Sequence, residues 1–415
     1  MGPPSQNITV IGAGIVGLAS AVALRREGYQ VTIIDRLPPG EACSFGNSGG
    51  MPRNHAFPMA MPGIAWKVPS YLADPQGPLA IRWRSLPRLT PFLARFVRSS
   101  MRDRFLPILD QLSVMMQQSH AEWTRLIEDA GLEPLVSEDG ALTLYRTKAD
   151  RDLAWTTWQL LADRGADLRT LDGDQLRDFE PAVPRGYEFA VFEPDYRRTL
   201  DPHGICLGLA RYFERLGGEL RRETVSEVVP ADQGRFHVRT NKEDQCTDYV
   251  VIAAGAWSAR FAAAFGDAVP LEAARGYHAT IPRFTPMPKR PLFISDKKMS
   301  LNPMAAGLRT GGNIEFSGLE SQPDYSRPSR QLDVVRTLYP EAEISRHTKW
   351  AGDRPMMPDS LPVIGTSQRH PHVIYAFGHG QYGLALAAVT GRLVAEIVGA
   401  RTPVVDIHPL RPDRF

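Results

Sequence analysis

The sequence predicts a protein of mixed α/β class (α/β with α+β character), in which a Rossmann-like domain is interleaved with an antiparallel-sheet domain. The first observation is a strand, a glycine-rich turn, a helix and a second strand within residues 8–35. The second is another strand, glycine loop and apolar helix at residues 373–398. The third is the stretch between them, which mixes helices and strands without a nucleotide-binding loop. Since the two glycine units lie at opposite ends of the chain, each domain should be built from discontinuous segments.

The glycines of the first unit follow a buried β-branched run and have the spacing G-x-G-x-x-G. Gly12 allows a tight turn, Gly14 lets a pyrophosphate approach the backbone, and Gly17 lets helix and strand pack closely. The helix N-terminus offers free N–H groups and a positive dipole end to phosphates. Asp35, which ends the next strand, is placed to accept hydrogen bonds from a ribose hydroxyl. This context favours a dinucleotide site over a glycine turn that binds nothing, and it leaves the identity of the dinucleotide open.

Length, charge and cysteines narrow the class of protein. The chain has 415 residues, enough for two domains, and a net charge of +2 from 48 Lys and Arg against 46 Asp and Glu. That balance indicates neither a nucleic acid nor a polyanion as partner. Cys43, Cys206 and Cys246 lie far apart without a C-x-x-C pair, which argues against a disulfide framework or a metal site and suits a reducing compartment.

The sequence also predicts where the protein acts. Residues 1–7 show no signal-peptide pattern and no apolar run reaches about 18 residues, so a cytoplasmic protein is expected. Between Arg82 and Arg104, seven arginines and one aspartate alternate with apolar residues, in an amphipathic stretch that Pro87 and Pro91 should break. One interpretation is peripheral contact with a partner or with the inner face of a membrane. The other, which we favour, is a helix packed on its own domain with its arginines directed outward.

The domain boundaries follow from these units. The nucleotide-binding domain takes residues 1–50, 198–262 and 348–415, and the substrate-binding or cap domain takes residues 51–197 and 263–347. Helices are expected at 112–130, 150–163, 201–216 and 384–398, and strands at 140–145, 219–229, 235–240, 249–252, 277–281, 292–294 and 373–377.

Four stretches carry a resemblance to a known family: Val10–Gly17 with Asp35, Cys43–Met51, Val250–Ser258 and Trp350–Gly383. With them the sequence resembles FAD-dependent amine and amino-acid oxidoreductases of the D-amino acid oxidase and glycine oxidase type. It is most similar to bacterial D-amino acid dehydrogenases, whose subgroup is also resembled by Pro78–Ile81 and Arg275–Tyr277. The most specific match is the closing signature WAGDRPMMPD, followed by PVIG and GHG.

The resemblance implies FAD as the cofactor, held by the Rossmann-like domain, with the substrate on the antiparallel sheet. The flavin should be non-covalent, because Met356 and Met357 stand where sarcosine oxidase-like members attach it to cysteine, and no cysteine follows Cys246. N–H groups at the start of the last helix should stabilise negative charge on the reduced flavin. The residues implied to contact FAD are Gly12, Gly14, Ile15, Val16, Gly17, Asp35, Arg36, Ser44, Asn47, Gly49, Gly50, Met51, Val225, Ala254, Gly255, Trp257, Gly378, His379, Gly380, Gln381, Tyr382, Gly383 and Leu384.

Arg354 matches the family arginine that holds the substrate carboxylate, a role that suits its planar fork. The alternative is a structural salt bridge with Asp353 or Asp359. Tyr277, His278 and Tyr382 are expected to line the pocket with His379, and His278 is either a proton acceptor or an outward strand histidine. Glycine oxidase-like members carry a second arginine at the position of Gln381, so the pocket should differ from theirs.

The implied activity is oxidation of a D-amino acid, with a cyclic one such as D-proline or hydroxy-D-proline as one candidate. Hydride transfer to flavin N5 would give the imino acid and then the 2-oxo acid, and the electrons would pass to a quinone or another carrier. One alternative is an oxygen-using glycine, sarcosine or D-amino acid oxidase that releases hydrogen peroxide. Another is a non-catalytic flavoprotein subunit of an electron-transfer complex.

Overall fold

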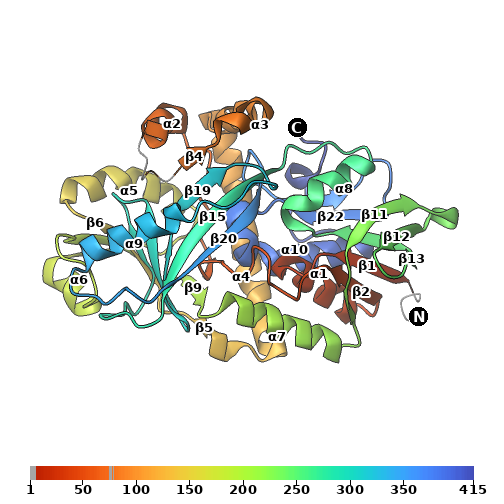
Figure 1. Cartoon of the computed structure of the whole chain (residues 1–415), viewed down its shortest axis with the longest axis horizontal. Coiled ribbons are helices and arrows are strands. Elements are labelled where there is room, and N and C mark those ends of the chain that lie inside the picture. Colours follow the sequence, from red (N-terminus) through yellow and green to blue (C-terminus); the bar gives the residue numbers. More distant parts are fainter. Residues whose placement is uncertain (1–5, 74–76, 78) are drawn as a thin grey trace.

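The computed structural model describes residues 6–73, 77 and 79–415, and it shows two large sheets side by side (Figure 1). Pro78, part of one resembling stretch, lies outside the described residues, and the rest of that stretch forms β4 (Leu79–Ile81). The six-stranded sheet and the first and last helices occupy one half of the molecule, and a ten-stranded sheet occupies the other. The mixed α/β fold class is therefore confirmed.

The six-stranded sheet has the order β10-β2-β1-β14-β22-β21 and is parallel except for β21 at one edge. Val10 of β1 pairs with Ile33 on one side and Val251 on the other, in β-branched runs buried on both faces. Because parallel strands end at one edge, the turns after β1, β2 and β14 meet there. The strands are β1 (Asn7–Ile11), β2 (Gln30–Asp35), β10 (Glu219–Arg222), β14 (Tyr249–Ile252), β21 (Val363–Thr366) and β22 (Val373–Phe377).

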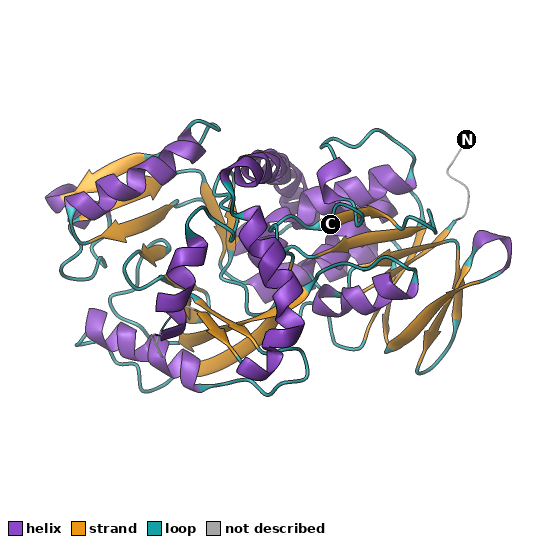
Figure 2. Cartoon of the chain, turned by 90° about the horizontal axis from the view of Figure 1, so that it is seen from above, coloured by secondary structure: helices purple, strands orange, loops and turns teal. Residues whose placement is uncertain are grey.

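Both faces of this sheet are covered, and Figure 2 shows helices on both sides of its strands. One face carries the apolar helices α1 (Ile15–Arg26), α10 (Gly383–Val398), α7 (Pro202–Arg215) and the long α4 (Arg102–Ala130), which share one core. The other face packs against α8 (Ser258–Ala264) and the small sheet of β11 (Val225–Pro230), β12 (Phe236–Thr240) and β13 (Gln245–Thr247).

The ten-stranded sheet is mostly antiparallel; among its described strands, β16–β6 and β19–β4 are the pairs that run in parallel. Its strands are β4, β6 (Ala141–Tyr145), β7 (Arg169–Asp172), β8 (Phe189–Glu193), β15 (Glu272–Ile281), β16 (Leu292–Ile294), β17 (Met299–Met304), β18 (Gly307–Gly311), β19 (Asn313–Phe316) and β20 (Thr348–Met356). Three helices pack against this sheet: α5 (Lys148–Ala162), α6 (Gly173–Phe179) and α9 (Ser326–Leu338). Strand β20 pairs with β15 along its length, so it belongs to this sheet. The predicted boundary at residue 348 instead assigned β20 to the nucleotide-binding domain. The division into domains stays a prediction.

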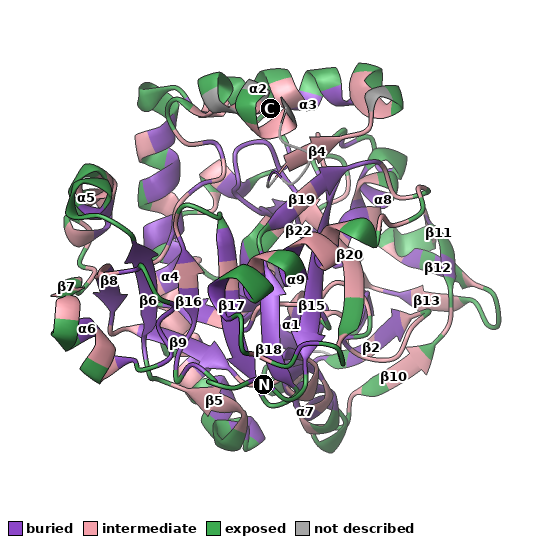
Figure 3. Cartoon of the chain, turned by 60° about the vertical axis from the view of Figure 1, so that its left-hand side comes forward, coloured by how far each residue is buried: buried purple, intermediate pink, exposed green. Residues whose placement is uncertain are grey.

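Between the halves lies a small sheet of β3 (Gly50–Pro52), β9 (Tyr196–Thr199) and β5 (Val136–Ser137). Two further helices, α2 (Ile64–Ala73) and α3 (Leu86–Ser99), form an edge with many exposed residues (Figure 3). The prolines do not break the basic stretch: Pro87 lies in the first turn of α3 and Pro91 lies within the helix. Leu89 and Phe92 are buried beneath α3, as the favoured interpretation predicts. Among the described helices, none has the length and apolarity needed to cross a membrane.

Candidate functional site

A cavity of about 730 Å³ reaches from the turn after β1 to the ten-stranded sheet, a size typical of small-molecule and cofactor sites. It brings together most residues predicted to bind the cofactor: Gly12, Gly14, Ile15, Val16, Asp35, Arg36, Ser44, Asn47, Gly50, Val225, Ala254, Gly255, Trp257, His379, Gly380, Gln381, Tyr382, Gly383 and Leu384. Arg354 lines the same cavity. Four predicted residues lie outside its wall: Gly17, Gly49, Met51 and Gly378.

The first glycine turn divides into two structural glycines and one that faces the cavity. Gly12 has φ +114°, and a Cβ there would lie 2.3 Å from the carbonyl oxygen of Ala253. A Cβ on Gly17 would lie 2.0 Å from the carbonyl oxygen of Gly12, so helix and strand pack as closely as predicted. At Gly14 the nearest atom is the Ser44 hydroxyl at 3.4 Å, so a side chain would project into the cavity instead. Gly14 therefore leaves room for a ligand.

Two of the N–H groups at this turn already have acceptors. The Asp35 carboxylate accepts from Ala13 N–H at 2.7 Å, and the Ser44 hydroxyl accepts from Ile15 N–H at 3.0 Å. The N–H groups of Gly14 and Val16 have no acceptor within the described residues, and both residues line the cavity. A pyrophosphate at this helix N-terminus would meet those two N–H groups, while Ser44 acts mainly as a cap for α1.

One end of the cavity, where the adenosine is expected, lies at the ends of β2 and β14. The Arg36 guanidinium lies 4.4 Å from the centre of the Trp257 ring, a cation–π contact on the cavity wall. Val225 is buried, and its carbonyl oxygen accepts from Arg260 at 3.0 Å. Sequence reasoning missed Glu223, which lines the cavity beside Val225.

The loop before β3 is held rigidly over the cavity. Asn47 Oδ1 accepts from Gly49 N–H at 2.7 Å, and the buried Arg309 donates to the Asn47 carbonyl oxygen at 2.6 Å. Gly49 and Met51 are turned away: Gly49 pairs with Thr199 N–H, and the Met51 side chain is buried in the core beneath α1. The prediction that Met51 contacts the cofactor is corrected for its side chain, because strand alternation in β3 directs it into that core.

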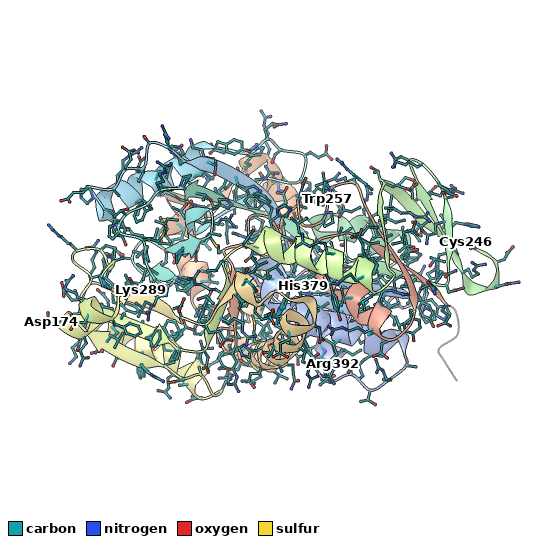
Figure 4. All side chains as sticks on the ribbon, turned by 90° about the horizontal axis from the view of Figure 1, so that it is seen from below. Asp174, Cys246, Trp257, Lys289, His379 and Arg392 are labelled. Carbon is teal, nitrogen blue, oxygen red and sulfur yellow. The ribbon has the colours of Figure 1, made fainter. Side chains whose placement is uncertain are left out.

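The closing glycine loop is anchored by two buried side chains. His379 lies near the centre of the molecule (Figure 4), and its Nε2 is 2.9 Å from the Thr390 hydroxyl of α10. Burial lowers the pKa of His379 to about 3, so its imidazole is neutral. The Tyr382 hydroxyl donates to the Phe57 carbonyl oxygen at 2.7 Å.

The N–H groups of this loop differ in their availability. Tyr382 N–H donates to the His379 carbonyl oxygen at 2.9 Å. It is therefore not available to a ligand, contrary to the prediction from the sequence. The N–H group of Gln381 has no acceptor in the described part of the chain, and Gln381, Gly383 and Leu384 all line the cavity. They form an electropositive helix N-terminus suited to a developing anion.

Arg354 lines the cavity, and the two carboxylates near it in the sequence form ion pairs with other arginines. Asp353 accepts from Arg275 at 2.9 Å and Asp359 accepts from Arg414 at 2.8 Å, so the salt-bridge alternative for Arg354 is wrong. Within the described residues, Arg354 has no hydrogen bond or ion pair. Burial lowers its pKa, and the nearby Cys43 thiol opposes that effect. An arginine stays protonated nonetheless, so the cavity contains an unpaired cation.

The guanidinium of Arg354 lies directly over Gly276 of β15. A Cβ on Gly276 would be 2.4 Å from Cζ of Arg354, and the two strands pair Gly276 with Gly352, two residues before Arg354. Only a residue without a side chain leaves this space for the guanidinium. No sequence pattern points to this contact, because it depends on the register of β15 against β20.

Tyr277 and His278 do not line the cavity, and their predicted roles are corrected. Tyr277 lies on the face of β15 away from Arg354, where its hydroxyl donates to Glu315 and accepts from Asp324 N–H. His278 shares the face of Gly276 but is buried under Trp350, which stacks on it at 5.0 Å. Burial and then the charge of Arg309 lower the pKa of His278 to about 3. A buried imidazole that stays neutral and is screened by Trp350 is a poor proton acceptor for substrate.

Sequence reasoning missed a polar pair in the same cavity. His55, in the loop after β3, has its Nδ1 2.9 Å from Oε2 of Glu193, the last residue of β8. Tyr196 and Phe293 line the cavity beside it. These residues come from segments far apart in the chain, and His55 lies in a loop without periodicity, so no local pattern pointed to them.

The geometry fits FAD in its main features: a glycine turn with open N–H groups, a carboxylate at the end of β2, and a helix N-terminus at the other end of the cavity. Comparison with known proteins agrees. The family model described as "DAO: FAD dependent oxidoreductase" matches residues 7–397. A D-amino-acid oxidase of Bradyrhizobium diazoefficiens is 35% identical, with 100% of both chains covered.

Two further relatives extend the comparison. A D-amino acid dehydrogenase of the same organism is 28% identical, with 99% of each chain covered. The crystal structure of glycine oxidase from Geobacillus kaustophilus superposes with a TM-score of 0.75 at 20% identity, covering 99% of this chain and 100% of the other, which shows a shared fold. The resemblance found in the sequence is confirmed, and the protein belongs to the DAO family of FAD-dependent oxidoreductases.

Proposed function

We propose that the protein oxidises a D-amino acid to the imino acid, which water converts to the 2-oxo acid and ammonia. The observation that carries this proposal is the unpaired guanidinium of Arg354 in the cavity, since a carboxylate is its natural counter-ion. The printed names of the 35% and 28% identical relatives, a D-amino-acid oxidase and a D-amino acid dehydrogenase, support the choice of a D-amino acid.

The residues divide the work between binding and positioning. Arg354 would hold the α-carboxylate in a bidentate pair and so orient the α-hydrogen. FAD, bound non-covalently along the cavity, supplies the hydride acceptor at N5. The N–H group of Gln381 and the positive end of α10 would stabilise the negative charge that arrives with the hydride. His379 and Tyr382 hold that loop in place through Thr390 and the Phe57 carbonyl oxygen.

The test is anaerobic bleaching of the flavin by a panel of D-amino acids, L-amino acids, D-proline and N-methylglycine. Bleaching by D-amino acids is expected, and its absence with every compound would favour a non-catalytic flavoprotein subunit. Replacing Arg354 with leucine should lower kcat/KM by roughly 10²-fold or more through KM, with the flavin spectrum intact. Arg336, exposed on α9 and paired with Asp333, is a matched control, and its leucine variant should behave as wild type.

A preference for a cyclic substrate was suggested by the stretch Arg275–His278, and it loses support because the three side chains of that stretch do not line the cavity. Arg275 pairs with Asp353, and Tyr277 lies on the opposite face of β15 from Arg354. D-Proline is therefore tested in the panel without being the expected best substrate. If the flavin is bound non-covalently, denaturation should release all of it and leave no flavin attached to Cys43.

The electron acceptor is proposed to be a quinone or another carrier, with peripheral membrane contact through α2 and α3. Trp66 of α2 is 89% exposed, and Arg95 and Arg98 of α3 are exposed beside the apolar Val97. An apolar and cationic surface of this kind suits anionic lipid headgroups. Faster reoxidation by a quinone analogue than by oxygen, and cosedimentation with anionic vesicles that Trp66→Ala weakens, are expected. Equal or faster reoxidation by oxygen with peroxide release would identify an oxidase.

A further inference from the structure

His55 presents one ring nitrogen to the cavity and turns the other to a buried carboxylate. Its Nδ1 is 2.9 Å and 3.2 Å from the two carboxylate oxygens of Glu193, whose side chain is 8% exposed. Because a carboxylate accepts, Nδ1 carries the proton and Nε2 is left as the functional atom. In the described part of the structure Nε2 has no hydrogen-bond partner, although His55 lines the cavity. An oriented, unpartnered nitrogen on a cavity wall indicates a ligand contact.

Aromatic rings hold the His55 ring in this orientation. Phe293 stacks on it at 5.9 Å and 18°, and Phe57, Trp158 and Tyr196 present ring edges at 5.5, 5.8 and 6.1 Å. Phe293 and Tyr196 also line the cavity, so the space in front of Nε2 has aromatic walls. Such walls accommodate a flat group, and Nε2 is the polar atom placed among them.

The Glu193 carboxylate favours the protonated form of His55. Burial by itself lowers the pKa of His55, but the Glu193 carboxylate raises it more, and the net shift is upward. Three tyrosines that line the cavity, Tyr145, Tyr196 and Tyr382, interact electrostatically with Glu193; burial raises the pKa of each, so they stay neutral. When His55 is protonated, the ion pair is a dipole whose positive end, Nε2–H, faces the cavity.

We propose that this end of the cavity is the subsite for the substrate side chain, and that His55, positioned by Glu193, selects D-amino acids whose side chain ends in a carboxamide or a carboxylate. The inference rests on the proposed D-amino acid oxidation, in which Arg354 holds the α-carboxylate elsewhere in the same cavity. A planar carbonyl group lies flat between the aromatic rings and accepts from Nε2–H. An aliphatic side chain leaves Nε2–H without an acceptor, and a cationic one meets the positive end of the dipole.

D-Asparagine, D-aspartate and D-leucine are near-isosteric and separate these cases. In wild type, kcat/KM for anaerobic flavin reduction should favour D-asparagine or D-aspartate over D-leucine. His55→Leu should lower that ratio by about 10-fold or more, with D-leucine oxidised as well as before. Glu193→Gln keeps an acceptor for Nδ1 and removes the charge, so it should weaken D-aspartate more than D-asparagine. His237→Leu, on the exposed side of β12, is the control and should leave every ratio unchanged.

Binding of compounds that lack the amino group provides a readout independent of turnover. The dissociation constants of succinamate and 4-methylpentanoate, measured by calorimetry on the holoprotein, should differ in favour of succinamate, and His55→Leu should remove about a 10-fold preference. The preference should fall as the pH rises through the pKa of His55, and that fall should move to lower pH in Glu193→Gln.

The outcomes separate the two proposals. If D-leucine and D-asparagine both bleach the flavin but the ratios are the same in wild type and His55→Leu, the subsite assignment is overturned and the D-amino acid oxidation stands. A wild-type preference for D-lysine overturns the assignment as well. If no D-amino acid bleaches the flavin, both proposals fall together.

Discussion

Replacing Gly276 with alanine should disable the proposed carboxylate anchor without removing any charge. The added Cβ would lie 2.4 Å from Cζ and 2.5 Å from Nη2 of Arg354. Non-bonded carbon atoms in contact are about 3.5–4.0 Å apart, so the guanidinium must move by roughly 1 Å or more. A misplacement of about 1 Å in a positioning group lowers turnover by roughly 10²-fold. Complete loss of two charge-assisted hydrogen bonds, at about 1.5–3 kcal/mol each, sets an upper limit near 10⁴-fold for Arg354→Leu.

The assay is kcat/KM for anaerobic flavin reduction in four proteins: wild type, Gly276→Ala, Arg354→Leu and the double variant. Gly276→Ala should lower kcat/KM by roughly 10²-fold in the wild-type background, with flavin absorbance and Tm retained. In the Arg354→Leu background the same alanine should cost little, because no guanidinium is left to displace. An equal loss in both backgrounds would refute the reasoning, since the alanine would then act through β15 itself.

The remaining predictions concern the glycine turn and the buried histidines. Gly12→Ala should lower the unfolding free energy by about 2–4 kcal/mol, because Gly12 has φ +114° and its Cβ would lie 2.3 Å from the Ala253 carbonyl oxygen. Gly14→Ala should keep wild-type stability and lose flavin affinity. Denaturant titration measures the stability, and flavin absorbance measures the affinity. The pKa of His278 and of His379 is about 3 in the folded protein against 6.5 ordinarily, so the unfolded chain binds protons first. The unfolding free energy should fall as the pH drops from about 6.5 toward 3, by up to roughly 1.4 kcal/mol per pH unit for each histidine, and His379→Asn should show a shallower slope.

The sequence was most informative where structure and ligand contact are both local. The unit β1–α1–β2 was predictable because its glycines, its apolar helix and Asp35 follow one another within the chain. The strands at 292–294 and 373–377 have the predicted bounds, since each is a short apolar run between turns. Helix α4 begins ten residues earlier than predicted, at Arg102, with Pro107 accommodated in its second turn.

Where sheet membership or facing matters, local patterns were insufficient. The single strand expected at 219–229 is two strands, β10 in the six-stranded sheet and β11 in the small sheet, because the chain leaves one sheet for the other at Glu223 and Thr224. Period-2 alternation predicts a strand and does not say which sheet it joins. Tyr277 was misplaced for a related reason: only the register against β20 shows that Gly276, and not Tyr277, faces Arg354.

The pairing of carboxylates around Arg354 explains why one arginine in a crowded region remains available. Arg275 and Arg414 neutralise Asp353 and Asp359, and each pair is also satisfied by backbone carbonyl oxygens. A half-buried guanidinium left without a counter-ion is unfavourable for folding, because desolvation is not offset by a partner. Binding a carboxylate removes that penalty, so the same arrangement that weakens the fold locally strengthens the affinity for an amino acid. The free charge, and not the mere presence of an arginine, is therefore what the structure contributes to the functional argument.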